Sequence, residues 1–184
     1  MKKVVYSGVL ILLLLVQACI NDINESDNAG KSPSSTEIFM EKDDIEFANN
    51  ASTISLGEIE LGKLAIQKGS DKRIKNFGTL LVKHHTKANR KLKQIALAKK
   101  LKIPTAPDTI TQKEITVLSQ LSGKAFDKAF LDYITANQDK NLAIFETAAK
   151  HVYDKDLRKT ANRDVLIINR HIYALNGIRA MIQR

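Results

Sequence analysis

The chain has 184 residues, enough for one domain of ordinary size together with a leader and a tail. It contains no Trp, three Pro and eight Gly, a composition that favours helices, and its single cysteine excludes an intrachain disulfide. The formal net charge of +9 is compatible with an anionic partner, but the lysines are scattered and no aromatic residues are interleaved with them. That pattern is typical of solvated helix faces, so no nucleic-acid partner is expected.

The N-terminus has the pattern of a bacterial lipoprotein leader. Two lysines, Lys2 and Lys3, precede an apolar run over 4–16, which is too short for a membrane span of ~20 residues. The segment Val16-Gln17-Ala18-Cys19 resembles a lipobox, in which a small residue precedes the lipidated cysteine. The resemblance implies a signal peptide over 1–18, with lipid on the thiol of Cys19 and, after cleavage, on its amino group. An ordinary cleaved signal with an incidental cysteine and an uncleaved anchor are the alternatives.

The residues after Cys19 indicate where the protein resides. Several acyl chains hold a protein stably to a membrane, and the presence of Ile20, rather than Asp, favours the outer membrane. We therefore expect a protein of the bacterial cell envelope, an outer-membrane lipoprotein on the periplasmic side that contacts the membrane through lipidated Cys19. Polar residues predict a flexible tether over 19–42, and the folded domain is expected over 43–184.

Apolar residues repeat with helical spacing along the folded domain, and nothing alternates with period two for long enough to predict a strand. Gly69-Ser70-Asp71 ends one helix and caps the next. Thr111 and Glu114 form a capping box for a short helix, and Asp154 and Asp156 open the last helix. The predicted helices cover 43–68, 72–100, 111–121, 124–152 and 156 to the C-terminus.

The sequence therefore predicts an all-α domain. We expect a four-helix up-down bundle of ferritin-like type, with a short extra helix in the crossover between the second and third long helices. A crossover of about 20 residues is long enough to run back along the bundle, as it does in ferritin-like folds.

Three ionisable side chains, Glu58, His85 and His171, each stand at the centre of an apolar helical stripe. Their apolar neighbours on the stripes are, in order, Ile54 and Leu61, Leu81 and Ala88, and Ile167 or Ile168 and Leu175. A buried charge without a partner costs several kcal/mol, so these groups imply partners. The partners would be each other, other polar side chains, water or a metal.

All three residues lie near the mid-height of a bundle about 40 Å long, so we expect them to approach one another inside it. One divalent ion (zinc, iron or copper) held by Glu58, His85 and His171 is chemically reasonable, with Asp164 and Gln138 as neighbours. The alternative is a hydrogen-bonded cluster in which Glu58 accepts from one or both histidines.

The remaining chemistry argues against an enzyme. A di-iron oxidase is not favoured, because di-iron bundles need Glu-x-x-His on two helices, and apolar residues stand three positions before His85 and His171. The sequence contains no Gly-rich phosphate loop and no zinc-finger spacing. His84 is expected at the boundary of the core, and His151 in solvent near a helix end.

Six segments, in order along the chain, carry a family resemblance. They are Glu58-x-x-x-Gly62-Lys63-Leu64-Ala65, His84-His85-Thr86-Lys87-Ala88-Asn89, Leu101-x-Ile103-Pro104, Leu121-Ser122-Gly123-x-x-Phe126-Asp127, Leu142-Ala143-Ile144-Phe145-Glu146 and His171. Residues 47–175 thus resemble the ferritin-like bacterial family known as domain of unknown function (DUF) 4142. The resemblance implies a secreted or lipid-anchored four-helix bundle for which no biochemical activity is agreed.

The chain departs from the family pattern at two positions. The family usually has Asp where His84 stands, and a histidine where Gln138 stands. If relatives bind a metal through an inward Glu and three histidines, this chain keeps Glu58, His85 and His171 and lacks one ligand.

We therefore expect a lipid-anchored envelope protein with a helical-bundle domain and a non-enzymatic binding or envelope-maintenance role. The first alternative is a mononuclear metal-binding protein for storage, sensing or redox protection, using Glu58, His85 and His171. The second is an interaction module that docks a protein partner, of unknown identity, on its basic surface.

Overall fold

The computed structural model describes residues 40–182, all of which lie in one compact unit, residues 38–184. The described residues form five helices and no strand, so the predicted all-α class is confirmed. The helices are α1 (Lys42–Lys68), α2 (Lys72–Ala98), α3 (Thr109–Ser119), α4 (Gly123–His151) and α5 (Lys155–Ile182). None of these helices is long and apolar enough to cross a membrane. The predicted signal peptide, Cys19 and nearly all of the predicted tether lie outside the described residues.

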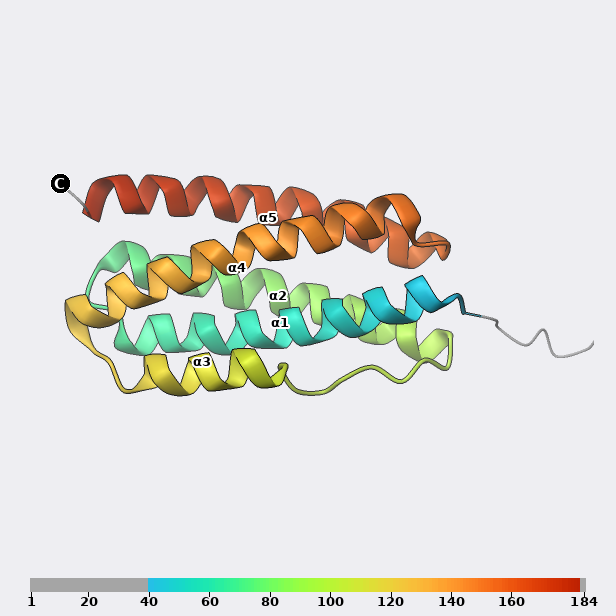
Figure 1. Cartoon of the computed structure of the whole chain (residues 1–184), viewed down its shortest axis with the longest axis horizontal. Coiled ribbons are helices and arrows are strands. Elements are labelled where there is room, and N and C mark those ends of the chain that lie inside the picture. Colours follow the sequence, from blue (N-terminus) through green and yellow to red (C-terminus); the bar gives the residue numbers. More distant parts are fainter. Residues whose placement is uncertain (1–39, 183–184) are drawn as a thin grey trace, which may run out of the picture. The chain divides into compact units, whose positions relative to one another are not determined.

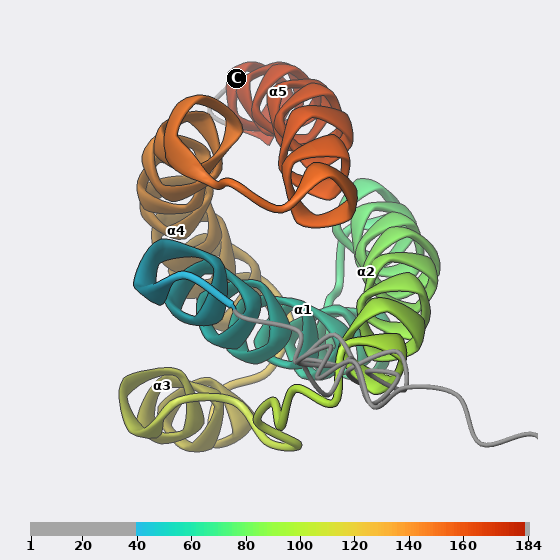
Figure 2. The ribbon, with the colours of Figure 1, turned by 90° about the vertical axis from the view of Figure 1, so that its right-hand side faces the viewer.

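The four long helices pack side by side as two hairpins. The hairpins are α1–α2 and α4–α5, and α1 also packs on α4 while α2 packs on α5, so each long helix touches two others closely (Figure 2). From the end of α2 the chain runs back along the bundle through a loop and α3 (Figure 1). The helix α3 lies outside the ring of four, against α1 and α4.

The ends of the helices follow local capping chemistry. The carboxylate of Asp71 accepts from the N–H of Arg73 at 2.8 Å at the start of α2, as predicted. The predicted capping box at Thr111 is wrong. Asp108 is the N-cap of α3, because its carboxylate accepts from both the N–H of Thr111 at 2.9 Å and the hydroxyl of Thr111 at 2.7 Å.

Two buried aspartates hold the turns of the hairpins. Asp127, near the start of α4, accepts from the backbone N–H groups of Ser70 and Asp71, each at 2.9 Å, and from the hydroxyl of Ser70. Asp44, near the start of α1, accepts from the N–H groups of Tyr153 and of the next residue at 2.9 and 3.0 Å. Each hairpin therefore supplies the carboxylate that satisfies the turn of the other hairpin.

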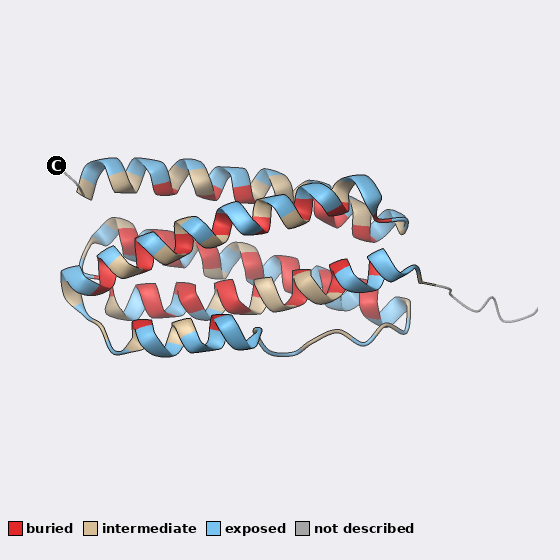
Figure 3. Cartoon of the chain, viewed as in Figure 1, coloured by how far each residue is buried: buried red, intermediate tan, exposed pale blue. Residues whose placement is uncertain are grey.

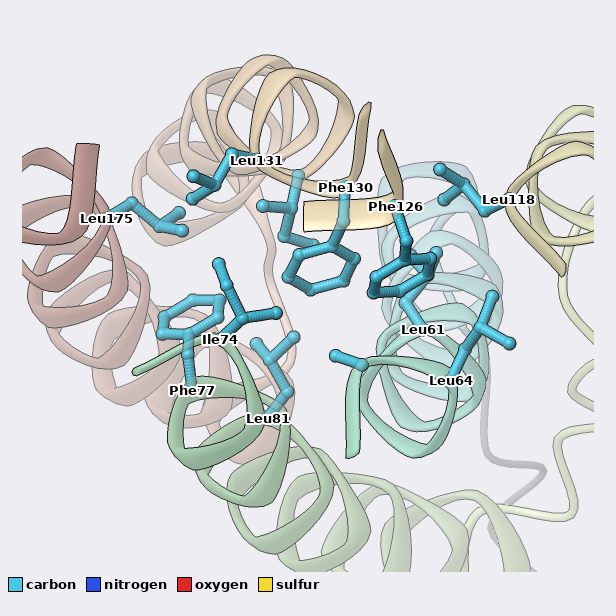
Figure 4. Packing of buried hydrophobic residues seen from close by; sticks show 12 residues of the cluster. Leu61, Leu64, Ile74, Phe77, Leu81, Leu118, Phe126, Phe130, Leu131 and Leu175 are labelled. Carbon is cyan, nitrogen blue, oxygen red and sulfur yellow. The ribbon is translucent and has the colours of Figure 1, made fainter. Parts of the chain in front are cut away.

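The apolar core consists of two clusters, one towards each end of the bundle. Buried residues lie on the inward sides of the helices (Figure 3). The cluster near the α1–α2 turn is built around Phe77, Phe126 and Phe130 (Figure 4). The other cluster includes Phe47 and Phe145, whose rings meet edge to face with centroids 5.3 Å apart.

The space between the two clusters is polar. On each long helix, buried polar residues stand between the apolar residues of one cluster and those of the other. We call this set the central polar layer: Glu58, His85, Gln138, Asn141 and His171.

The helices α1 and α2 approach each other closely at two glycines. A Cβ atom on Gly78 would lie 2.5 Å from the backbone oxygen of Gly62 and 2.9 Å from the Cβ of Ala65. A Cβ on Gly62 would lie 2.7 Å from the backbone oxygen of Gly78. Since backbone oxygens cannot rotate away, any larger residue at these positions forces the two helices apart.

We expect Gly78→Ala to lower the free energy of unfolding by about 2 to 3 kcal/mol, although Ala has the higher helix propensity. Gly177→Ala is the control, because Gly177 is also inside a helix but is exposed, and nothing lies within 4 Å of the added Cβ. The control should raise stability by up to about 1 kcal/mol, as measured by urea denaturation. Equal effects of the two changes would contradict the steric argument.

Candidate functional site

The central polar layer draws one or two residues from each long helix. Glu58 comes from α1, His85 from α2, Gln138 and Asn141 from α4, and His171 from α5. Glu58, Gln138 and His171 have no exposed surface, while His85 and Asn141 are 6% and 3% exposed. The inward positions predicted for Glu58, His85 and His171 are therefore correct.

The carboxyl group of Glu58 is bound to α4. Its Oε1 accepts from the side-chain amides of Asn137 and Asn141 at 2.8 and 3.1 Å. Burial raises the pKa of Glu58 from 4.5 to about 8, although the amides of Asn137, Gln138 and Asn141 favour the ionised form. Glu58 is therefore largely protonated at neutral pH, and the expected hydrogen bond from a histidine to Glu58 is replaced by bonds from two asparagines.

Three imidazoles meet where α2 packs on α5. His84 Nδ1 and His171 Nε2 are 2.9 Å apart, so the two nitrogens share one proton, and the rings stack with centroids 5.2 Å apart. The ring of His85 lies 5.5 Å from that of His171, and the ring of Phe77 meets His171 edge to face. His84 was expected only at the core boundary. The structure makes it a half-buried member of the cluster.

All three histidines are held in the neutral form. Burial, with the positive charges that His171 and His84 would carry, lowers the pKa of His85 from 6.5 to about 3. Burial also lowers the pKa of His171 to about 4, and the positive charge that His84 would carry lowers it by a smaller amount. The pKa of His84 is lowered by burial and by Lys83, Arg170 and Lys87. The layer is thus uncharged near neutral pH.

Several buried atoms of this region have no hydrogen-bonding partner among the described residues. They are Glu58 Oε2, His85 Nε2, Asn89 Oδ1, Gln138 Nε2 and Oε1, and His171 Nδ1. An unpartnered buried polar group costs roughly 1 to 3 kcal/mol, and so many in one region is unusual for a folded domain. These atoms can bind a guest molecule or ion without breaking an existing contact.

A small internal cavity lies beside the imidazoles. Its volume is about 10 Å³, and its lining includes Ser55, His84, His85 and Asp164. That is about the space of one water molecule. Asp164 is 7% exposed, and its carboxylate makes a two-pronged ion pair with Arg163 at 2.7 and 2.9 Å. The predicted neighbour Asp164 is therefore near the imidazoles but already has a cationic partner.

A surface groove of about 350 Å³ lies between α1, the start of α3 and α4. Asn137 and Asn141 form part of its wall, and these two amides also bind Glu58. Gly57 lets the start of α3 pack closely on α1 beside the groove, because a Cβ at this position would lie 2.7 Å from the side chain of Thr111. The asparagines thus connect the buried carboxyl group to a site of the size that small ligands use.

Glu58, His85 and His171 are suitable metal ligands by their chemistry, but their side chains are not arranged around one point. Each predicted ligand, Glu58, His85 and His171, has one buried atom that is capable of ligation and lacks a partner. However, no three His, Cys, Asp or Glu side chains within residues 40–182 are arranged to hold a metal ion. The predicted metal set stays a prediction, and it requires movement of side chains. His151 is exposed, as expected.

Glu58→Gln should change how stability depends on pH. In the wild type, the stability that Glu58 contributes is complete below pH 4.5 and is lost as the pH rises through about 8, because the native state holds a proton that the unfolded chain releases. The variant should therefore gain stability relative to the wild type by up to about 1.4 kcal/mol per pH unit across this window. Urea denaturation at about pH 5, 7 and 9 measures the difference.

His85 and His171 contribute the opposite slope at lower pH, since their stability is present above 6.5 and is lost as the pH falls towards about 3 and 4. Both proteins share that slope, so it cancels in the comparison. Glu60→Gln, an exposed change on α1, is the control. Parallel stability curves for wild type and Glu58→Gln would show that Glu58 titrates like a solvated carboxylate.

Comparisons with known proteins place the fold and the family. Residues 29–176 match the family described as "Domain of unknown function (DUF4142)". Among solved structures, a DUF305 fragment from Deinococcus radiodurans superposes with a TM-score of 0.67 at 11% identity, covering 76% of this chain and 96% of that chain. A putative secreted DUF305 protein from Streptomyces coelicolor gives a TM-score of 0.66 at 13% identity, covering 76% and 93%.

These identities support a shared fold and nothing finer, and no curated protein matches the chain. The family match spans most of the chain, including every member of the central polar layer. The protein therefore belongs to the DUF4142 family, as the residue pattern predicted.

Proposed function

We propose that this protein is a lipid-anchored protein of the bacterial envelope whose bundle binds a small guest in the central polar layer. Its role would be binding or envelope maintenance without catalysis. We further propose that the domain is a four-helix up-down bundle of ferritin-like type, which the close packing of the two hairpins supports. Lipidation of Cys19 and an outer-membrane location on the periplasmic side belong to the same proposal. The mass of the mature N-terminus tests the lipidation.

The observation that carries the binding role is the group of unpartnered buried atoms on all four long helices. A core kept only for stability would hold apolar side chains at these positions, because a fitting apolar residue removes the desolvation cost. The layer interrupts an otherwise continuous apolar core, so it lowers stability in the absence of a guest. A guest with donors and acceptors would restore that loss.

Binding fits the layer better than turnover does. The side chains of the layer are enclosed by the helices, and the cavity beside the imidazoles has room for about one water molecule or a single ion. A substrate of ordinary size could occupy the outer groove, but Asn137 and Asn141 lie between that groove and the carboxyl group of Glu58. The geometry therefore favours a small guest held by polar contacts.

Gln138→Leu tests whether the layer is kept for function. Neither polar atom of the Gln138 amide makes a hydrogen bond of ordinary geometry among the described residues, although the amide is near enough to Glu58 to lower the pKa of Glu58. We therefore expect the free energy of unfolding of the leucine variant to be about 1 to 3 kcal/mol higher than that of the wild type. The exposed change Gln67→Leu should alter stability by less than about 0.5 kcal/mol. A loss of stability in Gln138→Leu would mean that Gln138 has a structural role, and the proposal would lose its main support.

A mononuclear metal site is the second candidate, because Glu58, His85 and His171 each keep one free ligating atom. One equivalent of zinc, iron or copper should then raise the Tm by mass action. His85→Ala and His171→Ala should each abolish the rise, whereas His151→Ala should retain it. Because Glu58 is largely protonated at neutral pH, metal binding must release its proton, so the affinity should fall as the pH drops below about 8. The affinity should fall more steeply towards about pH 4, where His171 also takes up a proton. If none of the three metals raises the Tm, the metal site is wrong and an uncharged polar guest remains the proposal.

A further inference from the structure

The helix α2 carries positive charge without any negative charge. Its 27 residues contain six Lys and two Arg and neither Asp nor Glu. The cations are Lys72, Arg73, Lys75, Lys83, Lys87, Arg90, Lys91 and Lys93. All but Arg73 are exposed, while the opposite side of the helix is buried in the core. The outward side of α2 is therefore a basic face whose cations extend over about 32 Å, from Lys72 to Lys93.

These charges are not neutralised by the protein itself. Within residues 40–182, the one ion pair that involves α2 is that of Arg73 with Asp71, at 2.6 Å. The seven exposed cations make no ion pair. An acidic residue one turn away would offset the charge of a helical lysine, and α2 has no acidic residue, so its cations add up to a strong local positive potential.

The basic face extends onto α5. The contact between His84 and His171 brings the two helices together, and Lys83 and Arg170 each directly precede one of these histidines. Arg170 is exposed and makes no ion pair among the described residues. Positive charge thus lies on both sides of the seam between α2 and α5.

An apolar element accompanies the cations at the end of α2. Leu97 is 82% exposed, and it lies beside Arg90 and Lys93 in a surface hollow of about 410 Å³ that also reaches Ile59. In a phospholipid surface the phosphate groups form a plane, and the acyl chains lie just beneath it. A helix face with cations along it and an exposed apolar side chain at one end is complementary to such a surface.

We propose that the basic face of α2 docks flat on a membrane surface of anionic phospholipid, with its lysines and arginines at the phosphates and Leu97 inserted among the headgroups. This contact is independent of lipid on Cys19, and it would fix which side of the domain faces the membrane. A membrane is favoured over a nucleic acid because exposed Leu97 adds to binding only where there is an apolar layer to enter.

The test uses residues 20–184, which lack the leader and the cysteine but contain the whole helical unit with its own core. The protein is sedimented with vesicles of phosphatidylcholine alone or with about 30% phosphatidylglycerol, at low and at high salt. We expect binding only to the vesicles that contain phosphatidylglycerol, and we expect high salt to abolish it. No binding to these vesicles at low salt would overturn the proposal.

A matched pair of variants locates the surface. The combined change Lys83→Gln, Arg90→Gln and Lys93→Gln should lower the partition coefficient on the order of 100-fold at low salt. The control Lys124→Gln, Lys140→Gln and Lys150→Gln removes the same charge from exposed positions of α4 and should have only a small effect. Circular dichroism confirms that both variants fold. Equal losses in the two variants would mean that net charge, and no particular face, drives binding.

Two further measurements separate a membrane from other polyanions. Leu97→Ser should weaken vesicle binding several-fold and leave its salt dependence unchanged, because it removes apolar insertion but no charge. A DNA oligonucleotide is titrated in parallel. If the oligonucleotide binds more tightly than the vesicles at the same salt, and the α2 variant loses both, the face belongs to a nucleic acid and the membrane proposal is wrong.

Discussion

The hydrogen bonds from Asn137 and Asn141 to Glu58 are the interaction on which the interior of this bundle depends. They hold a carboxyl group between two apolar clusters, where burial raises its pKa to about 8 and leaves it largely protonated at neutral pH. A neutral carboxyl group can remain buried with one oxygen unpartnered, whereas a carboxylate there would cost far more. The polar layer is thus compatible with a folded bundle because its members are uncharged.

Contacts at the two ends of the bundle hold the helices around the polar layer. Asp127 and Asp44 each satisfy the turn of the opposite hairpin, so the hairpins are joined at both ends of the bundle, away from its centre. Close packing at Gly62 and Gly78 fixes α1 against α2. With the ends fixed, the polar side chains in the middle can lack partners without loss of the fold.

The two sides of α2 show how one helix can serve two purposes. Its inner side contributes Leu81 and Leu92 to the two clusters and His85 to the layer between them. The charged residues on its outer side are all positive, and Leu97 is its one large exposed apolar residue. Packing alone determines the inner side, while nothing in the fold requires the absence of acidic residues on the outer side. The proposed docking of α2 on an anionic membrane rests on that absence.

The sequence by itself determined the helical class, the helix ends to within about two residues and the inward direction of Glu58, His85 and His171, since each follows from periodicity and local caps. The family was also readable from the residue pattern. Tertiary structure alone decided the partners. Asn137 and Asn141 reach Glu58 because of how α4 packs on α1, and His84 joins His171 because of how α2 packs on α5. Periodicity specifies the side of a helix that faces inward, but a distance between side chains on different helices depends on packing angle and rotamer, which no local pattern encodes.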